Sequence, residues 1–237
     1  MKRAAHHPRF NRRDTVREIY RNDALIVVYK PPGILSQGDR TGDTDLLAIT
    51  RGLLAPHPSP HPFLGLVHRL DRPAAGLVVF ARSPAAAASL CEQFRRHTID
   101  KEYLAVVHGH PESSGTFRDL LIKDSETVTS RTAEDGEPGA RESILHYRIQ
   151  GVIRDRSLVA IRLETGRSHQ IRVQFSSRGF PIVGDRKYGS REVLRDPGMI
   201  ALWAHRLVLR DPGSNRLLNL ESPRPLHWPW HDQTQRR

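Results

Sequence analysis

The sequence predicts a single α+β domain in which strands outnumber helices. Short apolar runs of strand length recur along the chain, whereas only three segments favour helices, and no long linker rich in Pro, Ser and Gly separates two units. The 237 residues are 38% hydrophobic and 27% charged. This composition supplies a buried core and differs from that of disordered chains.

The first predicted strand covers residues 24–29, an apolar run rich in β-branched side chains. The sequence Lys30-Pro31-Pro32-Gly33 closes it with a turn. Residues 36–62 are rich in Gly, Pro, Asp and His, which is typical of a loop. We expect one short helix within that loop, at residues 45–54.

A second predicted strand, residues 76–81, leads into a helix. Ser83 is placed to cap this helix and Pro84 to occupy its first position, so the helix is expected to run from 84 to 97. Three further apolar runs predict strands at residues 103–108, 144–149 and 158–163.

The remaining segments contain one more predicted helix. Residues 112–139 form a polar, Gly-containing segment between two of the strands. Farther on, Ser168 is placed to cap a helix that carries Ile171 and Phe175 at helical spacing, and Gly179 ends it.

The charge balance favours a polyanionic partner. Lys and Arg number 37 against 26 Asp and Glu, which gives a net charge of +11 and a pI of about 10.6. Only five of the basic residues are lysines, and arginine binds phosphate bidentately and stacks on bases. Nucleic acid is therefore the expected partner, although charge alone does not separate RNA from DNA or from acidic proteins.

Other classes of protein are excluded by simple counts. One cysteine, Cys91, cannot build an intramolecular disulfide or a multi-cysteine zinc site. No apolar stretch approaches the roughly 18 residues of a transmembrane helix. The first 14 residues lack the apolar core of a secretory signal, so we expect a cytoplasmic protein with no membrane partner.

Asp71 is the first candidate for chemistry. It stands between Arg69 and Arg72 in a turn just ahead of the predicted strand 76–81. Positive neighbours favour the ionised carboxylate, which suits a nucleophile or a weak base close to a polyanion. The alternative is an ordinary surface ion pair.

A second candidate segment is Gly166-Arg167-Ser168-His169-Gln170-Ile171-Arg172, at the start of a predicted helix. Helix N-termini bind anions, and Arg172 lies one turn in, near the face of His169, where it can meet a carboxylate from elsewhere. The alternative is a capped helix with solvated basic residues.

Tyr103 begins a predicted strand in the sequence Lys101-Glu102-Tyr103. Its ring is suited to stack on an extruded base. The competing interpretation is a tyrosine half-buried in the core.

Two groups of side chains are candidate metal sites. Asp39, Asp43 and Asp45 form a loose carboxylate cluster that resembles a Mg²⁺ site of a nuclease, but Asp and Gly are also ordinary turn residues. His57, His61 and His68 match no tetrahedral template. The prediction is no metal.

Seven segments in order give the chain a strong resemblance to the RluA family of RNA pseudouridine synthases, from Asn22 to Leu209. Several motifs in order are more specific than any one of them. The segments are LIVVYKPPGIL, HRLDRPAAGLVVFARS, KEYLAVVHG, ESILHYRI, LETGRSHQIRVQF, GFPIVGDRKYG and the weaker LWAHRLVL.

This resemblance implies a mixed, largely antiparallel sheet flanked by helices, and an isomerase without a cofactor. In the implied reaction the N1–C1′ bond of uridine breaks, the uracil turns, and C5 joins C1′. Asp71 matches the essential aspartate, which either attacks covalently or removes a sugar proton. Tyr103 matches the tyrosine that stacks on the flipped uracil, and Arg172 matches the arginine that pairs with the aspartate. Arg69 matches the arginine expected in the space of the extruded base.

The resemblance also implies an RNA partner, a tRNA or an rRNA. The residues expected to bind it are basic side chains near the motifs: Arg69, Arg72, Lys30, Lys101, Arg167 and His169. Four positions depart from the family pattern. Ala74-Ala75 replaces a pair of hydroxyl residues, Trp203 stands where histidine is usual, and Tyr29 stands where asparagine is common.

The predicted organisation is a basic arm at residues 1–20, a catalytic domain at 21–225 and a frayed tail at 226–237. About 20 residues are too few for the S4 domain that precedes some relatives, so we expect none, and we expect a monomer. The arm offers Lys2, Arg3, Arg9, Arg12 and Arg13 to phosphates. Two rival functions remain: an inactive RNA-binding or RNA-folding protein of the same fold, and a metal-dependent nuclease.

Overall fold

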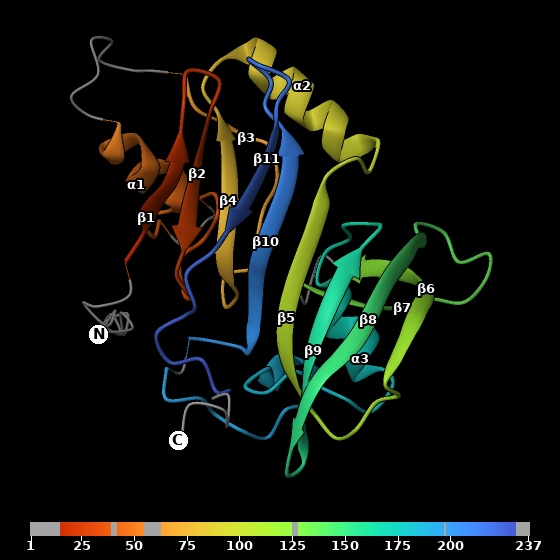
Figure 1. Cartoon of the computed structure of the whole chain (residues 1–237). Coiled ribbons are helices and arrows are strands. Elements are labelled where there is room, and N and C mark those ends of the chain that lie inside the picture. Colours follow the sequence, from red (N-terminus) through yellow and green to blue (C-terminus); the bar gives the residue numbers. More distant parts are fainter. Residues whose placement is uncertain (1–14, 39–41, 55–62, 125–127, 197, 231–237) are drawn as a thin grey trace, which may run out of the picture.

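The computed structural model describes residues 15–38, 42–54, 63–124, 128–196 and 198–230. Within these ranges lie three α-helices, one 3-10 helix and eleven strands, and all the strands join one sheet (Figure 1). The helices are α1 (Leu46–Leu53), α2 (Pro84–Arg95), α3 (Gln170–Ser176) and η1 (Arg186–Tyr188). The strands are β1 (Arg17–Arg21), β2 (Leu25–Lys30), β3 (Gly65–Leu66), β4 (Ala75–Ala81), β5 (Asp100–His108), β6 (Ser114–Asp124), β7 (Thr129–Thr132), β8 (Arg141–Ile153), β9 (Arg156–Leu163), β10 (Leu202–Arg210) and β11 (Leu217–Glu221).

The sheet is mixed and largely antiparallel, as the resemblance implied. Its order is β1-β2-β4-β10-β5-β9-β8-β6-β7, with β11 on β10 and β3 on β4. The β4–β10 pair is parallel, and each of the other strand pairs is antiparallel. The α+β prediction is confirmed.

Strands β2 and β4 are continuous apolar runs because both of their faces are covered. Leu25, Val27 and Val79 pack with α2 on one face, and Val28 and Phe80 pack with α1 on the other. Ser83 and Asp45 cap the two helices by accepting hydrogen bonds from Ala86 and Ala48 backbone N–H groups, at 3.1 and 2.7 Å. The larger half of the sheet packs its own core, with Ile171 and Phe175 of α3, against β5, β8 and β9.

The two halves of the sheet meet at the short parallel contact between β4 and β10. Only two residue pairs join these strands, Ala75 with Trp203 and Gly76 with Ala204. Gly76 has φ +128°, and a Cβ added to it would lie 2.3 Å from the Ala204 carbonyl oxygen. Glycine is therefore required at this junction.

Two expectations about this architecture were wrong, and one segment contains strands that were not predicted. The segment 112–139 contains the strands β6 and β7, whose mixed polar and apolar side chains leave one face open to solvent. The expected arm 1–20 overlaps β1, which pairs with β2. The expected tail includes Trp228 and Trp230, which are buried in the core, and Trp228 packs against Trp203 with ring centroids 5.6 Å apart.

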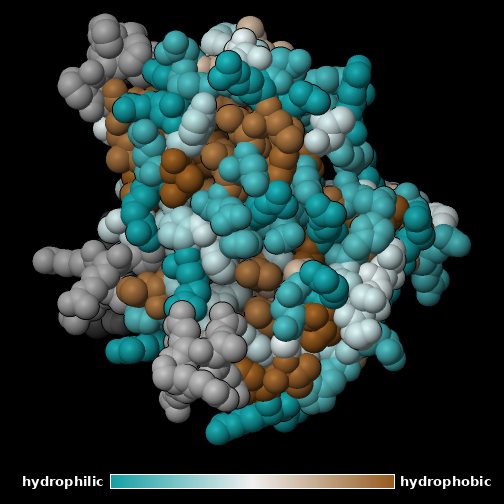
Figure 2. Space-filling view, viewed as in Figure 1, coloured by the Kyte–Doolittle hydropathy of each residue, from teal (hydrophilic) through white to brown (hydrophobic). Residues whose placement is uncertain are grey.

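The surface seen from this side is mostly hydrophilic, with a hydrophobic patch in its upper part, around β10 and β11, and smaller ones near the lower centre (Figure 2). None of the helices in the described ranges is long and apolar enough to cross a membrane. The basic residues of the arm that were expected to contact phosphates lie outside the described residues: Lys2, Arg3, Arg9, Arg12 and Arg13.

Candidate active site

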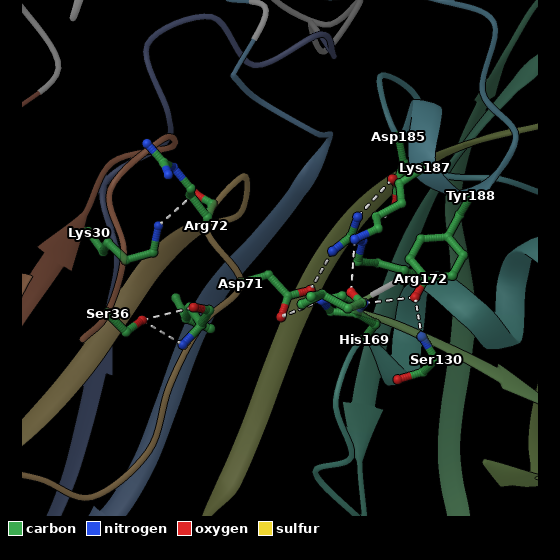
Figure 3. Close-up of polar contacts among 12 residues, drawn as sticks. Lys30, Ser36, Asp71, Arg72, Ser130, His169, Arg172, Asp185, Lys187 and Tyr188 are labelled. Carbon is green, nitrogen blue, oxygen red and sulfur yellow. Dashed lines mark hydrogen bonds and ion pairs between the residues drawn. The ribbon is translucent and has the colours of Figure 1, made fainter. Parts of the chain in front are cut away.

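Asp71 lies in a turn just before β4 that the side chains of Ser36 and Lys30 and backbone groups hold in place. The Ser36 hydroxyl donates to the Leu70 carbonyl at 2.8 Å and accepts from the Leu70 N–H at 3.0 Å (Figure 3). The Ala74 N–H donates to the Asp71 carbonyl at 3.1 Å and closes the turn. The backbone that carries the carboxylate is thereby fixed to the end of β4.

Lys30 supports the same turn from below. Its Nζ donates to the carbonyls of Pro31, Ile34 and Arg72 at 3.1, 2.9 and 3.1 Å, and the residue has no exposed surface. Carbonyl oxygens carry partial negative charge and offset part of the cost of burying the ammonium. The prediction that Lys30 contacts RNA was wrong, because the side chain faces the protein interior.

Arg172 joins Asp71 to a second carboxylate. Its Nη1 donates to Asp71 Oδ2 at 3.0 Å, while Nε and Nη2 donate to the two oxygens of Asp185 at 2.6 and 2.9 Å (Figure 3). The side chains of Arg172 and Asp185 are 5% and 1% exposed, against 25% for Asp71. Burial opposes the charge of Arg172, but the hydrogen bonds to Asp185 and the charge of Asp71 outweigh it and raise the pKa.

The expected pairing of Arg172 with the aspartate is therefore present, but its bidentate partner is Asp185. The expected cap of α3 was wrong. His169, not Ser168, stands at the N-cap position, in the left-handed conformation with φ +53°, and its side chain makes no capping hydrogen bond. This backbone geometry turns the imidazole toward Asp71.

His169 lies between Asp71 and the hydroxyl of Tyr188. Its Nε2 is 3.9 Å from Asp71 Oδ1, and its Nδ1 is 2.7 Å from the Tyr188 hydroxyl oxygen. That oxygen accepts a hydrogen bond of 2.8 Å from the Ser130 N–H of β7. The Tyr188 ring also lies against the Arg172 guanidinium, with 4.8 Å between Cζ and the ring centroid.

An open cleft with a volume of about 90 Å³ lies over these groups. Tyr103 of β5 lines it, half-buried, and burial together with the nearby carboxylate of Asp71 raises the pKa of its hydroxyl. The lining residues are Arg69, Leu70, Asp71, Ala74, Tyr103, Leu163, Gly166, Arg167, His169, Gln170, Ile171, Arg172 and Leu202. The three residues expected to carry the chemistry thus share one cleft.

The other residues expected to bind RNA differ in their surroundings. Arg69 and Arg167 are exposed and line the cleft. Arg72 is half-buried and pairs with Asp43 at 2.6 Å. Lys101 is half-buried, and burial lowers the pKa of its amine.

The rival metal groups have structural roles where they are described. Asp43 pairs with Arg72, and Asp45 caps α1. His68 accepts a hydrogen bond of 2.9 Å from the Val79 N–H and stacks on Phe94, and burial together with Lys101 lowers its pKa to about 3. Asp39, His57 and His61 lie outside the described residues. Within the described ranges, no group of three His, Cys, Asp or Glu side chains is arranged to hold a metal ion.

All of the residues that depart from the family pattern are packed into the protein. Ala75 pairs with Trp203 across the β4–β10 junction, and both are buried. Ala74 is buried and lines the cleft. Tyr29 is buried in β2, with the Arg17 guanidinium 5.2 Å from its ring centroid.

Sequence reasoning missed Asp185, Tyr188 and Ser36. The first two lie in the segment GFPIVGDRKYG, which carried part of the resemblance but received no role. Their acid and aromatic side chains were a usable signal. No local pattern marked Ser36, whose partner Leu70 is distant in the sequence.

The fold and this cleft define the class of the protein. Two human structures share the fold: RNA Pseudouridylate Synthase Domain Containing 4 has a TM-score of 0.73 at 23% identity and covers 89% of both chains. RNA Pseudouridylate Synthase Domain Containing 1 has a TM-score of 0.70 at 25% identity and covers 89% of this chain and 84% of the other. The chain has the pseudouridine synthase fold.

Sequence comparison then shows the family. A family model described as RNA pseudouridylate synthase matches residues 24–177. An uncharacterized RNA pseudouridine synthase of Bacillus subtilis, YlyB, is 34% identical over an alignment of 224 positions that covers 87% of this chain and 68% of the relative. The ribosomal large subunit pseudouridine synthase D of Haemophilus influenzae is 31% identical, over 87% of this chain and 67% of its own length. The chain belongs to the RluA-type RNA pseudouridine synthases, enzymes that isomerise uridine to pseudouridine in RNA.

Proposed function

We propose that this enzyme modifies a uridine of large-subunit ribosomal RNA and that Asp71, Tyr103 and Arg172 carry the reaction. The observation that supports the site most strongly is the position of Asp71. Its carboxylate is partly exposed in the cleft and is tied to a buried Arg172–Asp185 pair. Buried charge pairs near a partly open carboxylate are typical of functional sites.

Asp71 is proposed to act through one oxygen. Arg172 donates to Oδ2 and limits the rotation of the carboxylate, so that Oδ1 remains available to the ribose of a bound uridine. Both family roles, attack at C1′ and removal of a sugar proton, need an ionised carboxylate in a fixed position. The buried guanidinium supports both requirements.

Tyr103 is proposed to stack on the uracil. The raised pKa keeps its phenol protonated near neutral pH, so the ring offers a flat apolar face and a hydroxyl donor. A flipped base between Tyr103 and the cleft wall would be held while it turns. This geometry supports stacking more strongly than action as a phenolate base.

The names of the relatives and the charge of the chain support the proposed substrate class. Several relatives, including that of Haemophilus influenzae, are named ribosomal large subunit pseudouridine synthases. The exposed Arg69 and Arg167 at the cleft rim are proposed to contact the RNA backbone, with Arg69 entering the space that the base leaves. We also propose that the enzyme is a cytoplasmic monomer.

The test is pseudouridine mapping of total RNA from cells that lack this protein, complemented with the wild type or with Asp71→Asn. We expect one or more large-subunit rRNA sites to disappear in the deletion and to return only with the wild type. Sites lost in tRNA instead would overturn the rRNA assignment. Full restoration by Asp71→Asn would overturn the role of Asp71. RNA affinity of Asp71→Asn, measured in parallel, is expected to stay near the wild-type value.

A further inference from the structure

The geometry points to a further positioning residue: we propose that Tyr188, held by the backbone of β7, fixes His169 as a neutral donor whose Nε2–H faces the reacting oxygen of Asp71. This inference rests on the proposed role of Asp71. The sequence predicted no role for Tyr188 or Ser130, and it predicted only RNA binding for His169.

The donors present fix the direction of one hydrogen bond, and the proposal assigns the direction of the other. The Ser130 N–H can only donate, so the Tyr188 oxygen accepts from it at 2.8 Å. In the proposed arrangement the Tyr188 O–H proton points at His169 Nδ1, 2.7 Å away, and Nδ1 is the acceptor. A neutral imidazole with Nδ1 unprotonated carries its proton on Nε2, on the side of Asp71 Oδ1.

The two oxygens of Asp71 therefore have different neighbours. Oδ2 is bonded to Arg172 at 3.0 Å, whereas Oδ1 faces the His169 Nε2–H across 3.9 Å. That separation is longer than a hydrogen bond, so Oδ1 stays available for reaction while the neutral Nε2–H faces it. A cation at His169 would hold Oδ1 in an ion pair and lower its reactivity.

The surroundings of His169 keep it neutral. Its side chain is 14% exposed, and this burial lowers the pKa of the imidazole below its ordinary value by more than the charge of Asp71 raises it. Protonation at Nδ1 would also force the Tyr188 hydroxyl to turn its proton away. The charged and titratable groups that face His169 come from the turn before β4, from α3, from the following loop and from η1: Asp71, Arg172, Asp185, Lys187 and Tyr188.

The backbone is built for this placement. His169 adopts φ +53°, a left-handed conformation that is uncommon for residues other than glycine, although asparagine, aspartate and histidine adopt it more often than the rest. Such strain is found where the surrounding structure holds a side chain in a functional position. Lys187 adds a second link between η1 and the residues just before β7, because its Nζ donates to the Val128 carbonyl at 2.8 Å.

The test compares Tyr188→Phe, His169→Ala and His169→Gln with wild type, using the RNA site identified by mapping. Tyr188→Phe keeps the ring against Arg172 and removes only the hydroxyl. We expect kcat to fall about fivefold with KM unchanged, the size of one lost neutral hydrogen bond. The acid limb of the kcat profile should move to higher pH. Without the Tyr188 hydroxyl, protonation of His169 Nδ1 no longer breaks a hydrogen bond, so the pKa of His169 rises.

His169→Ala is expected to lower kcat at least tenfold, and His169→Gln, whose amide keeps a donor, to restore at least half of that loss on a logarithmic scale. Tyr20→Phe, a hydroxyl deletion in β1 far from the cleft, is the matched control and should keep wild-type kinetics. Two results would overturn this inference alone, provided that the wild type is active. The first is a kcat within twofold of wild type for both Tyr188→Phe and His169→Ala. The second is an unchanged acid limb of the kcat profile for a folded Tyr188→Phe variant. A wild type that forms no pseudouridine would overturn the proposed function instead.

Discussion

Replacing Asp185 by asparagine should destabilise the protein by about 3 kcal/mol. The carboxylate is 1% exposed and accepts two hydrogen bonds from Arg172, at 2.6 and 2.9 Å. An asparagine keeps one acceptor and turns an NH₂ group toward the other guanidinium N–H. Breaking a buried pair costs about 3–5 kcal/mol, and the remaining contact with Asp71 favours the lower end.

The loss can be measured by urea unfolding and by thermal melting. For a chain of this size 1 kcal/mol shifts Tm by about 2–4 °C, so Tm should fall by about 6–12 °C. The matched control is Asp119→Asn, because Asp119 accepts two hydrogen bonds from Arg178 at 2.9 and 3.0 Å but that pair is 16% and 31% exposed. We expect about 1 kcal/mol there. A loss below about 1 kcal/mol for Asp185→Asn, or equal losses for both variants, would refute the reasoning.

Three further outcomes are expected. Burial lowers the pKa of His68 to about 3 in the folded state, against 6.5 for the free side chain, so the folded state binds fewer protons than the unfolded state. The contribution of this site to the free energy of unfolding is therefore complete above pH 6.5 and falls as the pH drops toward 3. At pH 5 the loss is at most about 2 kcal/mol. In urea titrations His68→Gln should reduce this acid sensitivity, and an identical pH dependence would contradict the assignment. Gly76→Ala should cost about 3 kcal/mol or more, since its Cβ would meet the Ala204 carbonyl at 2.3 Å, and a melting temperature equal to wild type would rule out the close approach. Arg69→Ala should weaken RNA binding and reduce the salt dependence of log K by about one phosphate contact, which filter binding at several salt concentrations can test.

The elements that sequence reasoning predicted well are those whose signals are local. The apolar runs of β2 and β4 and the cap Ser83 depend on residues adjacent in the chain. The predicted helix after Ser83 ends at Arg95, two residues before the expected end. Such boundaries depend on fraying and on capping by the backbone.

The strands that were missed are stabilised by partners far away in the sequence. β6 and β7 carry charged residues on an open face, so their apolar content is diluted. β10 is in a segment that matched the family pattern, yet its strand character depends on pairing with β4, β5 and β11. Long-range pairing of this kind leaves a weak trace in a local window.

The candidate site was predictable in part. Asp71, Tyr103 and Arg172 share the cleft, as expected, because each belongs to a recognisable motif. The role of Lys30 was misjudged, since a lysine after an apolar strand gives no sign of whether its amine turns inward. The bidentate partner of Arg172 also could not be chosen, because two carboxylates compete for it and only the folded chain brings Asp185 closer.

The short parallel contact between β4 and β10 has a consequence for the order of events during synthesis. Ala75 finds its partner Trp203 only after most of the chain has left the ribosome. Arg172 and Asp185 also emerge long after Asp71. The nascent chain therefore stays without a finished catalytic centre until its last strands arrive, so that truncated products of translation should be inactive and should expose the apolar edge of β4 to chaperones.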